Sequence, residues 1–167
     1  MIVSRVISVI IFLWICIGTQ LLANGLGQKL PSFVMEDQYS KEIQSSLFKG
    51  KHLLLFLADR AGSKLTPNFT KVLEPKFRNK ATFIAIANVS SVPFFLKGFI
   101  RGKFKENYSY TVLMDWKGEL WEHFSCKDDV TTVVHIDPNG IAKFKLSGTG
   151  TEKEVEQIQH YLENNLK

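Results

Sequence analysis

The stretch LLLFLADRAGSKLTPNF, Leu53 to Phe69, decides the fold of this chain. It opens with a continuous apolar run, which predicts a strand buried on both faces of a sheet. An apolar spacing typical of a helix follows as far as Phe77, with Thr66 as the expected N-cap and Pro67 as the first helical residue. Pro75 is expected to kink this helix or to shorten it near its end. The stretch therefore predicts a strand, a loop and a helix in succession.

The segments that follow extend this pattern into an α/β domain. Residues 81–89 (ATFIAIANV) form a second apolar run, and a crossover of strand, helix and strand implies a parallel pair. Two later strands end in four-residue turns, Asp115 to Gly118 and Asp137 to Gly140. The first turn is expected to lead into a short helix through Leu120 and Phe124, and the second is expected to form a hairpin.

A final helix is predicted from Thr151, because Glu154 lies three residues further on, which is the spacing of a capping box. Its apolar stripe consists of Val155, Ile158, Leu162 and Leu166. The predicted order is therefore strand, helix, strand, irregular insert, strand, short helix, hairpin and helix.

The N-terminal residues are typical of an export signal. One basic residue, Arg5, precedes an apolar run from Val6 to Ile17, which is too short to span a bilayer comfortably. Small residues then provide a cleavage boundary. We expect a signal peptide over residues 1–25, cut near 23–25, and a single domain over residues 26–167. The mature protein is expected to be periplasmic or otherwise exported, and an uncleaved membrane anchor is the alternative.

The composition is that of an ordinary globular domain. Of the 167 residues, 45% are hydrophobic and 22% are charged, which suffices for one domain with a sizeable core. The net charge of +5 raises the affinity for anionic surfaces in general and does not indicate a nucleic-acid partner. Of the two cysteines, Cys16 lies in the expected leader, so the mature chain keeps only Cys126 and cannot form an intramolecular disulfide.

The predicted element order, with an ID-x-x-G hairpin before the last helix, resembles the thioredoxin and redoxin superfamily. Matching FLADRAGSKLTP to the superfamily pattern FWATWCGPCRAEMP places Ala61 and Lys64 at the two cysteine positions. Matching VTTVVHID to VPTTFLID places Thr131 where the cis-proline normally stands. The resemblance implies a thioredoxin-like, redoxin-type three-layer α/β sandwich, with a central mixed sheet and helices on both faces.

A closer resemblance is to the bacterial YtfJ family of small exported thioredoxin-like proteins that lack the CxxC motif. It covers essentially the whole expected mature chain. The matching motifs are A-x-R at Ala58 to Arg60 with Lys64, F-I-R at Phe99 to Arg101, D-x-x-G twice, and DPNG before the final helix.

We call the loop that contains Ala61 and Lys64, between the first predicted strand and helix, the redox corner. These two residues exclude dithiol chemistry, because alanine offers no nucleophile and lysine offers no exchangeable sulfur. Peroxidase activity needs the same sulfur. What remains is positive charge at a helix start, which is a candidate site for an anionic group such as a peptide carboxylate, with a glycine that lets it approach the backbone, although the sequence favours a solvated loop. The candidate ligand-binding residues are Arg60, Gly62, Ser63, Lys64 and Thr131. In a solvated loop these charges only keep the protein soluble.

Cys126 has two possible roles. Unpaired cysteines are among the most buried residue types, so the sequence favours a small buried hydrophobe. The alternative is a mixed disulfide with a partner, which would make the chain a thiol-dependent redox partner or enzyme.

The insert VPFFLKGFIRGKFKENYSY, residues 92–110, has the least ordinary composition in the chain. Aromatic and aliphatic residues alternate there with basic ones, namely Lys97, Arg101, Lys103 and Lys105. The sequence favours a crossover helix whose aromatic residues pack on the sheet beneath the lysine stems. The alternative is a basic amphipathic surface for anionic lipid or an acidic partner.

These observations together predict an exported, redox-inactive thioredoxin-like binding or adaptor protein with an unknown protein or peptide partner. No cofactor is expected. A metal site is not expected either, because the four histidines are scattered without ligand spacing, at His52, His123, His135 and His160. Membrane contact is expected only through an uncleaved leader or through the basic insert.

Overall fold

The computed structural model describes residues 25–166, which contain a seven-stranded mixed sheet with the strand order β2-β1-β5-β4-β3-β6-β7. The strands are β1 (Val34–Asp37), β2 (Glu42–Gln44), β3 (Leu53–Ala58), β4 (Thr82–Asn88), β5 (Val112–Asp115), β6 (Thr131–Ile136) and β7 (Ala142–Gly148). The α-helices are α2 (Thr66–Phe77), α3 (Lys97–Asn107), α4 (Glu119–His123) and α5 (Glu152–Asn165). Three 3-10 turns complete the order, namely η2 (Ser45–Phe48), η3 (Gly62–Lys64) and η4 (Phe94–Leu96).

Strand β3 lies inside the sheet, between β4 and β6, and all six of its residues are buried. It runs parallel to β4 and antiparallel to β6, with Phe56 opposite Ala85 on one side and Val133 on the other. The predicted parallel pair is therefore confirmed. β5 extends the sheet in parallel beyond β4, and β7 forms the predicted antiparallel hairpin with β6.

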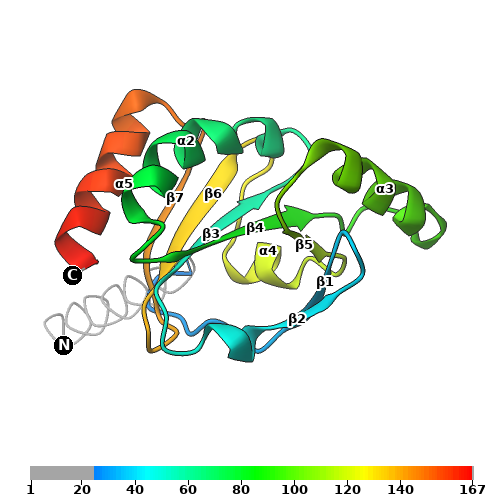
Figure 1. Cartoon of the computed structure of the whole chain (residues 1–167), viewed down its shortest axis with the longest axis horizontal. Helices are drawn as coiled ribbons and strands as arrows, with labels where there is room; N and C mark the ends of the chain where they lie inside the picture. Colours follow the sequence, from blue (N-terminus) through cyan, green and yellow to red (C-terminus); the bar gives the residue numbers. More distant parts are fainter. Residues whose placement is uncertain (1–24, 167) are drawn as a thin grey trace, which may run out of the picture.

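The two faces of β3 belong to different cores, because successive side chains of a strand point to opposite faces. Leu54 and Phe56 pack with α2 and α5, whereas Leu53, Leu55 and Leu57 pack with α4 and the N-terminal segment. Figure 1 shows α2 and α5 side by side, with α3 set apart from them toward the other end of the sheet. A third cluster places α3 over β4 and β5. The predicted three-layer α/β fold with helices on both faces is confirmed.

The helix ends follow local chemistry with one correction. At α5, the Thr151 side chain accepts from the Glu154 backbone N–H and the Glu154 carboxylate accepts from the Thr151 N–H, so the predicted capping box is confirmed. At α2, the prediction of Thr66 as the N-cap is wrong. Thr66 is the first helical residue and its hydroxyl is turned inward, toward Thr131. α2 contains Pro75 and ends two residues later, at Phe77.

The expected signal peptide lies outside the described residues, except for Gly25, which is buried against Phe124. Within residues 25–166, none of the helices has both the length and the apolar character needed to cross a bilayer.

Two of the scattered histidines meet in the structure. His52 precedes β3 and His135 lies on β6, and the antiparallel pairing of these strands brings His52 Nδ1 to 3.0 Å from His135 Nε2. The other ring nitrogen of His135 lies 2.9 Å from the Tyr161 hydroxyl. A neutral His135 imidazole has one nitrogen that donates and one that accepts, so it can form hydrogen bonds with both His52 and Tyr161. Because His135 is only 1% exposed, burial, followed by the proximity of His52, lowers its pKa to about 4.

We expect this histidine pair to make the fold sensitive to mild acid. Between pH 6.5 and pH 4 the unfolded chain binds a proton at residue 135 that the folded chain does not, so stability is fully present above about pH 6.5 and is lost as the pH falls. The free energy of unfolding in urea should fall by about 2 to 3 kcal/mol from pH 7.5 to pH 4.5.

The control is His160→Gln, which changes an exposed histidine on α5 and should keep this fall. His135→Phe should remove most of it. An equal fall in His135→Phe would mean that other groups cause the acid sensitivity.

Candidate functional site

The redox corner, the loop between β3 and α2, is held closed by its own carboxylate. Asp59 Oδ1 accepts a hydrogen bond from the Gly62 N–H at 2.7 Å, and Oδ2 accepts one from the Asp129 N–H at 3.2 Å. The Ser63 N–H donates to the Asp59 carbonyl at 2.9 Å. The backbone N–H groups of Gly62 and Ser63 are therefore already bonded within the chain, and an external anion would compete with Asp59 for the Gly62 N–H.

The expectation that Gly62 lets a ligand approach the backbone is wrong. Gly62 is buried, and a Cβ atom there would lie 2.2 Å from the carbonyl oxygen of Val130. The space above this glycine is thus filled by the chain just before β6. Only a residue without a side chain permits so close a contact.

Thr131 lies beside this loop, but it is fully buried. Its hydroxyl donates to the Gly62 carbonyl at 2.9 Å and lies 3.1 Å from the Thr66 hydroxyl. Thr131 therefore ties β6 to η3 and to the start of α2, and its side chain has no contact with solvent.

The other three corner residues face outward. Arg60 and Lys64 are exposed, and Ser63 is half-buried with its hydroxyl donating to the Arg60 carbonyl at 2.9 Å. The structure thus divides the five predicted residues into a buried pair, Gly62 and Thr131, and an accessible trio, Arg60, Ser63 and Lys64.

A cleft lined in part by Ser63 lies between the start of α2 and the end of α3. We call it the α2–α3 cleft, and it encloses about 290 Å³ including its open mouth. Its floor is formed by Phe56, Ala58, Ala85 and Ala87 of β3 and β4. Its two walls are formed by Ser63 and Thr66 on one side and by Phe104, Tyr108 and Tyr110 on the other. The small alanine side chains of the floor leave room that larger residues would fill.

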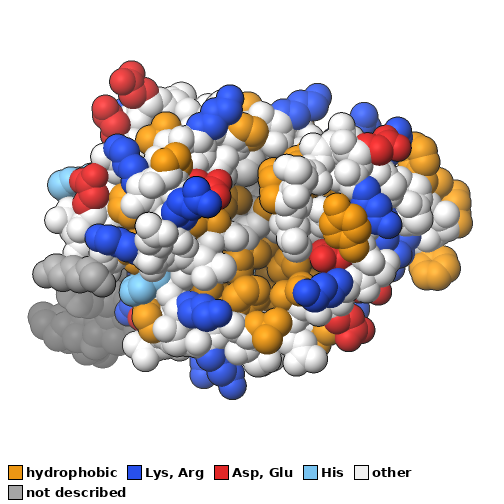
Figure 2. Space-filling view, in the orientation of Figure 1, with side chains coloured by type: hydrophobic (Ala, Val, Ile, Leu, Met, Phe, Trp, Pro, Cys, Tyr) orange, Lys and Arg blue, Asp and Glu red, His pale blue; other side chains and the backbone are white. Residues whose placement is uncertain are grey.

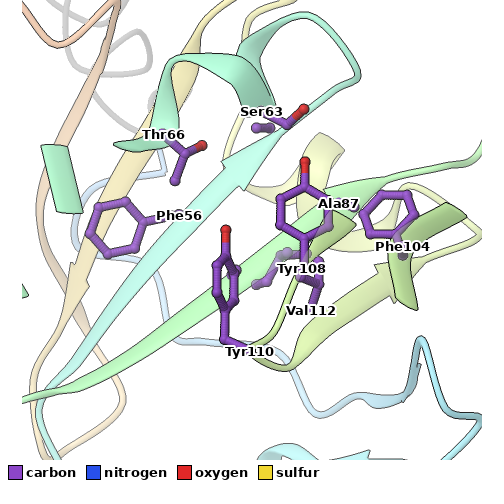
Figure 3. Close-up of a pocket in the computed structure, with 11 residues that line it drawn as sticks. Phe56, Ser63, Thr66, Ala87, Phe104, Tyr108, Tyr110 and Val112 are labelled. Carbon is purple, nitrogen blue, oxygen red and sulfur yellow. The ribbon is translucent and has the colours of Figure 1, made fainter. Parts of the chain in front are cut away.

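Figure 3 shows that the hydroxyls of Tyr108 and Tyr110 point toward Ser63 and Thr66 across the cleft. The rings form a continuous wall, because Tyr108 stacks on Phe104 at a centroid distance of 5.3 Å and meets Tyr110 edge-on at 5.5 Å. Among residues 25–166, neither tyrosine hydroxyl has a protein hydrogen-bond partner, so both can bind a ligand or water. Burial, followed by the neighbouring Tyr108, raises the pKa of Tyr110, so Tyr110 keeps its proton at neutral pH.

Gln38 fixes the position of this wall. Its side chain is fully buried, donates to the Tyr110 carbonyl at 2.7 Å and accepts from the Val112 N–H at 2.9 Å. The sequence did not predict the cleft or this glutamine, because neither the spacing of Tyr108 and Tyr110 nor a lone glutamine after β1 is a motif.

Cys126 lies on the other side of the sheet from the cleft floor, packed against the core beneath α4. It is half-buried rather than fully buried. Burial raises the pKa of its thiol to about 11, which the nearby Thr132 hydroxyl and Lys145 offset only in part. A thiol with such a pKa is almost entirely protonated at neutral pH and is a poor nucleophile.

The structure corrects the expectation that the aromatic residues of the insert pack on the sheet. Phe94, Phe95 and Phe99 are 83%, 81% and 62% exposed, whereas the insert residues that pack toward the sheet are Val92, Ile100, Phe104 and Tyr108. The expected crossover helix does form, as α3, but most of its aromatic surface faces solvent.

The four basic residues of the insert differ in their surroundings. Arg101 is ion-paired with Glu36 and lies over the Trp116 ring, and Lys103 pairs with Glu106 at 2.7 Å. Lys97 lies over the rings of Phe94 and Trp116, and Lys105 lies over Tyr39.

Within residues 25–166, histidine, cysteine and carboxylate side chains do not assemble into a group of three that could hold a metal ion. Within these residues, the pair formed by His52 and His135 has no third ligand of this kind.

Comparison with known proteins supports the fold. No protein-family model matches the chain, and no curated protein matches it. Among solved structures, the chain is similar to a protein assigned as the thiol:disulfide interchange protein DsbE of Chlorobium tepidum, with a TM-score of 0.63, 18% identity, and coverage of 85% of this chain and 98% of that one.

Two further structures have comparable similarity. The exposed lipoprotein thioredoxin of Streptococcus pneumoniae gives a TM-score of 0.61 at 17% identity, covering 79% of this chain and 100% of that one. The thiol peroxidase of Chromobacterium violaceum gives a TM-score of 0.57 at 12% identity, covering 85% of this chain and 88% of that one. The chain therefore has a thioredoxin-like fold.

The close contact at Gly62 predicts a sharp cost for any side chain at this position. Gly62→Ala should lower the free energy of unfolding by about 1 to 3 kcal/mol, because the new methyl group overlaps the Val130 carbonyl. Gly102→Ala is the matched control, since a Cβ there meets nothing within 4 Å and alanine favours a helix interior by up to about 1 kcal/mol. Urea unfolding of the two variants measures the difference, and equal stability would mean that the corner can open.

The state of Cys126 predicts slow reaction with thiol reagents. At pH 8 a pKa near 11 in place of 9 reduces the thiolate fraction about 100-fold. Iodoacetamide should therefore modify Cys126 about two orders of magnitude more slowly in the native protein than in urea, as followed by mass spectrometry of the peptide that contains it. Rapid native labelling would instead favour the thiol-dependent alternative.

Proposed function

We propose that this chain is an exported, redox-inactive thioredoxin-like binding protein, and that its α2–α3 cleft takes one apolar or aromatic side chain of an extended peptide. The observation that carries the proposal is the chemistry of the redox corner. Ala61 and Lys64 stand where the superfamily has sulfur, and Asp59 already occupies the Gly62 N–H. The corner is thus closed to thiol exchange, whereas the cleft beside it is open.

The cleft has the features of a small binding site. It combines an apolar floor with a few polar groups that converge on it, as ligand sites commonly do. An inserted aromatic ring would contact Tyr108 edge-on or by stacking, and the Tyr110 and Ser63 hydroxyls would bind the peptide backbone.

The charge at the mouth of the cleft adds a preference for acidic peptides. Arg60 and Lys64 are exposed on either side of Ser63, which lines the cleft. In so exposed a position each ionic contact contributes only about 1 kcal/mol or less. Binding of a lone anion should therefore be weak, and the apolar side chain in the cleft should supply most of the affinity.

Export and the resemblance to the YtfJ family belong to the same proposal. The N-terminal apolar run and its small-residue boundary support export. One of the similar structures is an exposed lipoprotein, which agrees with a location outside the cytoplasm. The YtfJ assignment is supported by the order of the motifs quoted from the sequence.

Titration of the isotope-labelled protein with a short synthetic peptide containing one phenylalanine flanked by glutamates tests the binding site. Amide shifts should be largest at the loop 59–66 and at Tyr108 to Val112, which form the two walls. Arg60→Gln with Lys64→Gln should weaken binding about tenfold at low salt, in line with two contacts of up to about 1 kcal/mol each. The effect should diminish as salt shortens the Debye length to about 8 Å.

The matched control is Lys71→Gln with Lys153→Gln, which removes two exposed charges from α2 and α5 and should leave binding unchanged. If the largest amide shifts occur at Lys97, Arg101 and Lys103, the peptide binds to the insert, and the proposal that it binds in the α2–α3 cleft is refuted. The same protein should leave insulin disulfides unreduced, and dithiol turnover that persists in Cys126→Ser would refute redox inactivity.

A further inference from the structure

The start of α3 presents an aromatic projection that the rest of the chain leaves uncovered. Its members are Phe94, Phe95 and Phe99, which we call the phenylalanine tip, and each exposes more than 60% of its surface. Figure 2 shows hydrophobic side chains gathered at the end of the molecule where α3 lies, beside basic side chains. Single exposed hydrophobic residues are normal on a soluble protein, but adjoining large aromatic residues mark an interaction surface.

The tip is exposed because Trp116 occupies the space between the sheet and the start of α3. Trp116 covers the sheet side of the start of α3, and two cations lie over its ring, Lys97 Nζ at 4.8 Å and Arg101 Cζ at 5.5 Å from the centroid. Ile100 and Phe104, four residues apart, form the inner stripe of the helix. Phe99 therefore points outward, and the 3-10 turn before the helix carries Phe94 and Phe95 outward as well.

Basic groups surround the tip. The segment from residue 89 to residue 105 contains four lysine or arginine residues and no acidic residue. Lys97 Nζ lies 5.3 Å from the centre of the Phe94 ring, and Lys103 Nζ lies 5.7 Å from that of Phe99. Arg101 is paired with Glu36 and Lys103 with Glu106, so Lys97 and Lys105 are the charges that can reach a partner.

We propose that the phenylalanine tip docks this protein on anionic lipid bilayers, with its rings among the acyl chains and its lysines at the lipid phosphates. The shape of the surface favours this occupant. The tip is a projection, and a bilayer accepts projecting rings without a matching pocket, whereas a folded protein would need a cavity for each ring. Aromatic residues flanked by lysines are the composition that binds at the interface between headgroups and acyl chains.

This docking does not rest on the proposed function. The tip lies at the first turn of α3 and the 3-10 turn before it, whereas the α2–α3 cleft is lined by Phe104 and Tyr108 near the end of the helix. The two surfaces can therefore be tested and can fail separately.

The test uses Phe95→Trp as a reporter in protein purified from the producing cell, with its N-terminus established by mass spectrometry. Vesicles of phosphatidylglycerol and phosphatidylcholine should shift the added tryptophan emission to shorter wavelength, and lipids brominated on the acyl chains should quench it relative to the parent protein. Quenching of the added tryptophan reports whether residue 95 itself enters the bilayer. The measurement therefore remains informative when the N-terminal apolar segment is present.

Two sets of variants separate the contributions. Phe94→Ser with Phe99→Ser should weaken vesicle binding at least tenfold, and Lys97→Gln with Lys105→Gln should weaken it and reduce its salt dependence. The matched controls change exposed residues elsewhere, Val34→Ser with Leu47→Ser and Lys41→Gln with Lys71→Gln, and should retain binding.

Several outcomes would overturn the proposal. They are an absence of quenching at residue 95, equal affinity for vesicles of phosphatidylcholine alone, and equal losses in the control variants. A concentration-dependent dimer in sedimentation velocity that Phe94→Ser with Phe99→Ser abolishes, without vesicle binding, would assign the tip to a second copy of the chain.

Discussion

The structure depends on the complete burial of β3. A strand whose six side chains are all buried needs a covering layer on each face and a paired strand on each edge, because its backbone groups and its apolar side chains must both be kept from water. The mixed sheet supplies β4 and β6 at the edges. α2 and α5 cover one face and α4 covers the other. The short loop after Ala58 then has to turn the chain out of the sheet and back over it, which fixes the position of the redox corner.

At this corner the chain has a thioredoxin-like fold with no sulfur at residues 61 and 64, and hydrogen bonds hold the loop in place. The Asp59 carboxylate links the loop to the backbone of Asp129, and the Thr131 hydroxyl links β6 to Gly62. These bonds hold the loop against β6. The loop therefore forms a fixed wall for the adjacent cleft.

The two ends of α3 serve different surfaces. Near its C-terminal end, Phe104 and the following Tyr108 turn inward and form one wall of the α2–α3 cleft. At its start, Trp116 and the cations above it hold Phe94 and Phe99 away from the sheet. One crossover element thus carries a concave surface at one end and a projecting aromatic surface at the other.

The sequence by itself determined the central strand, the parallel crossover, the hairpin and the capping box of α5, because each depends on neighbours within a few residues. It also determined the absence of sulfur at Ala61 and Lys64, which is a matter of residue identity. The tertiary structure decided the rest. The inward turn of Thr66, the contact of Gly62 with Val130, the meeting of His52 with His135 and the exposure of Phe94 all depend on residues distant in the chain. An amphipathic pattern indicates that a helix has an apolar side, but only the packed neighbours determine whether that side has room against the sheet.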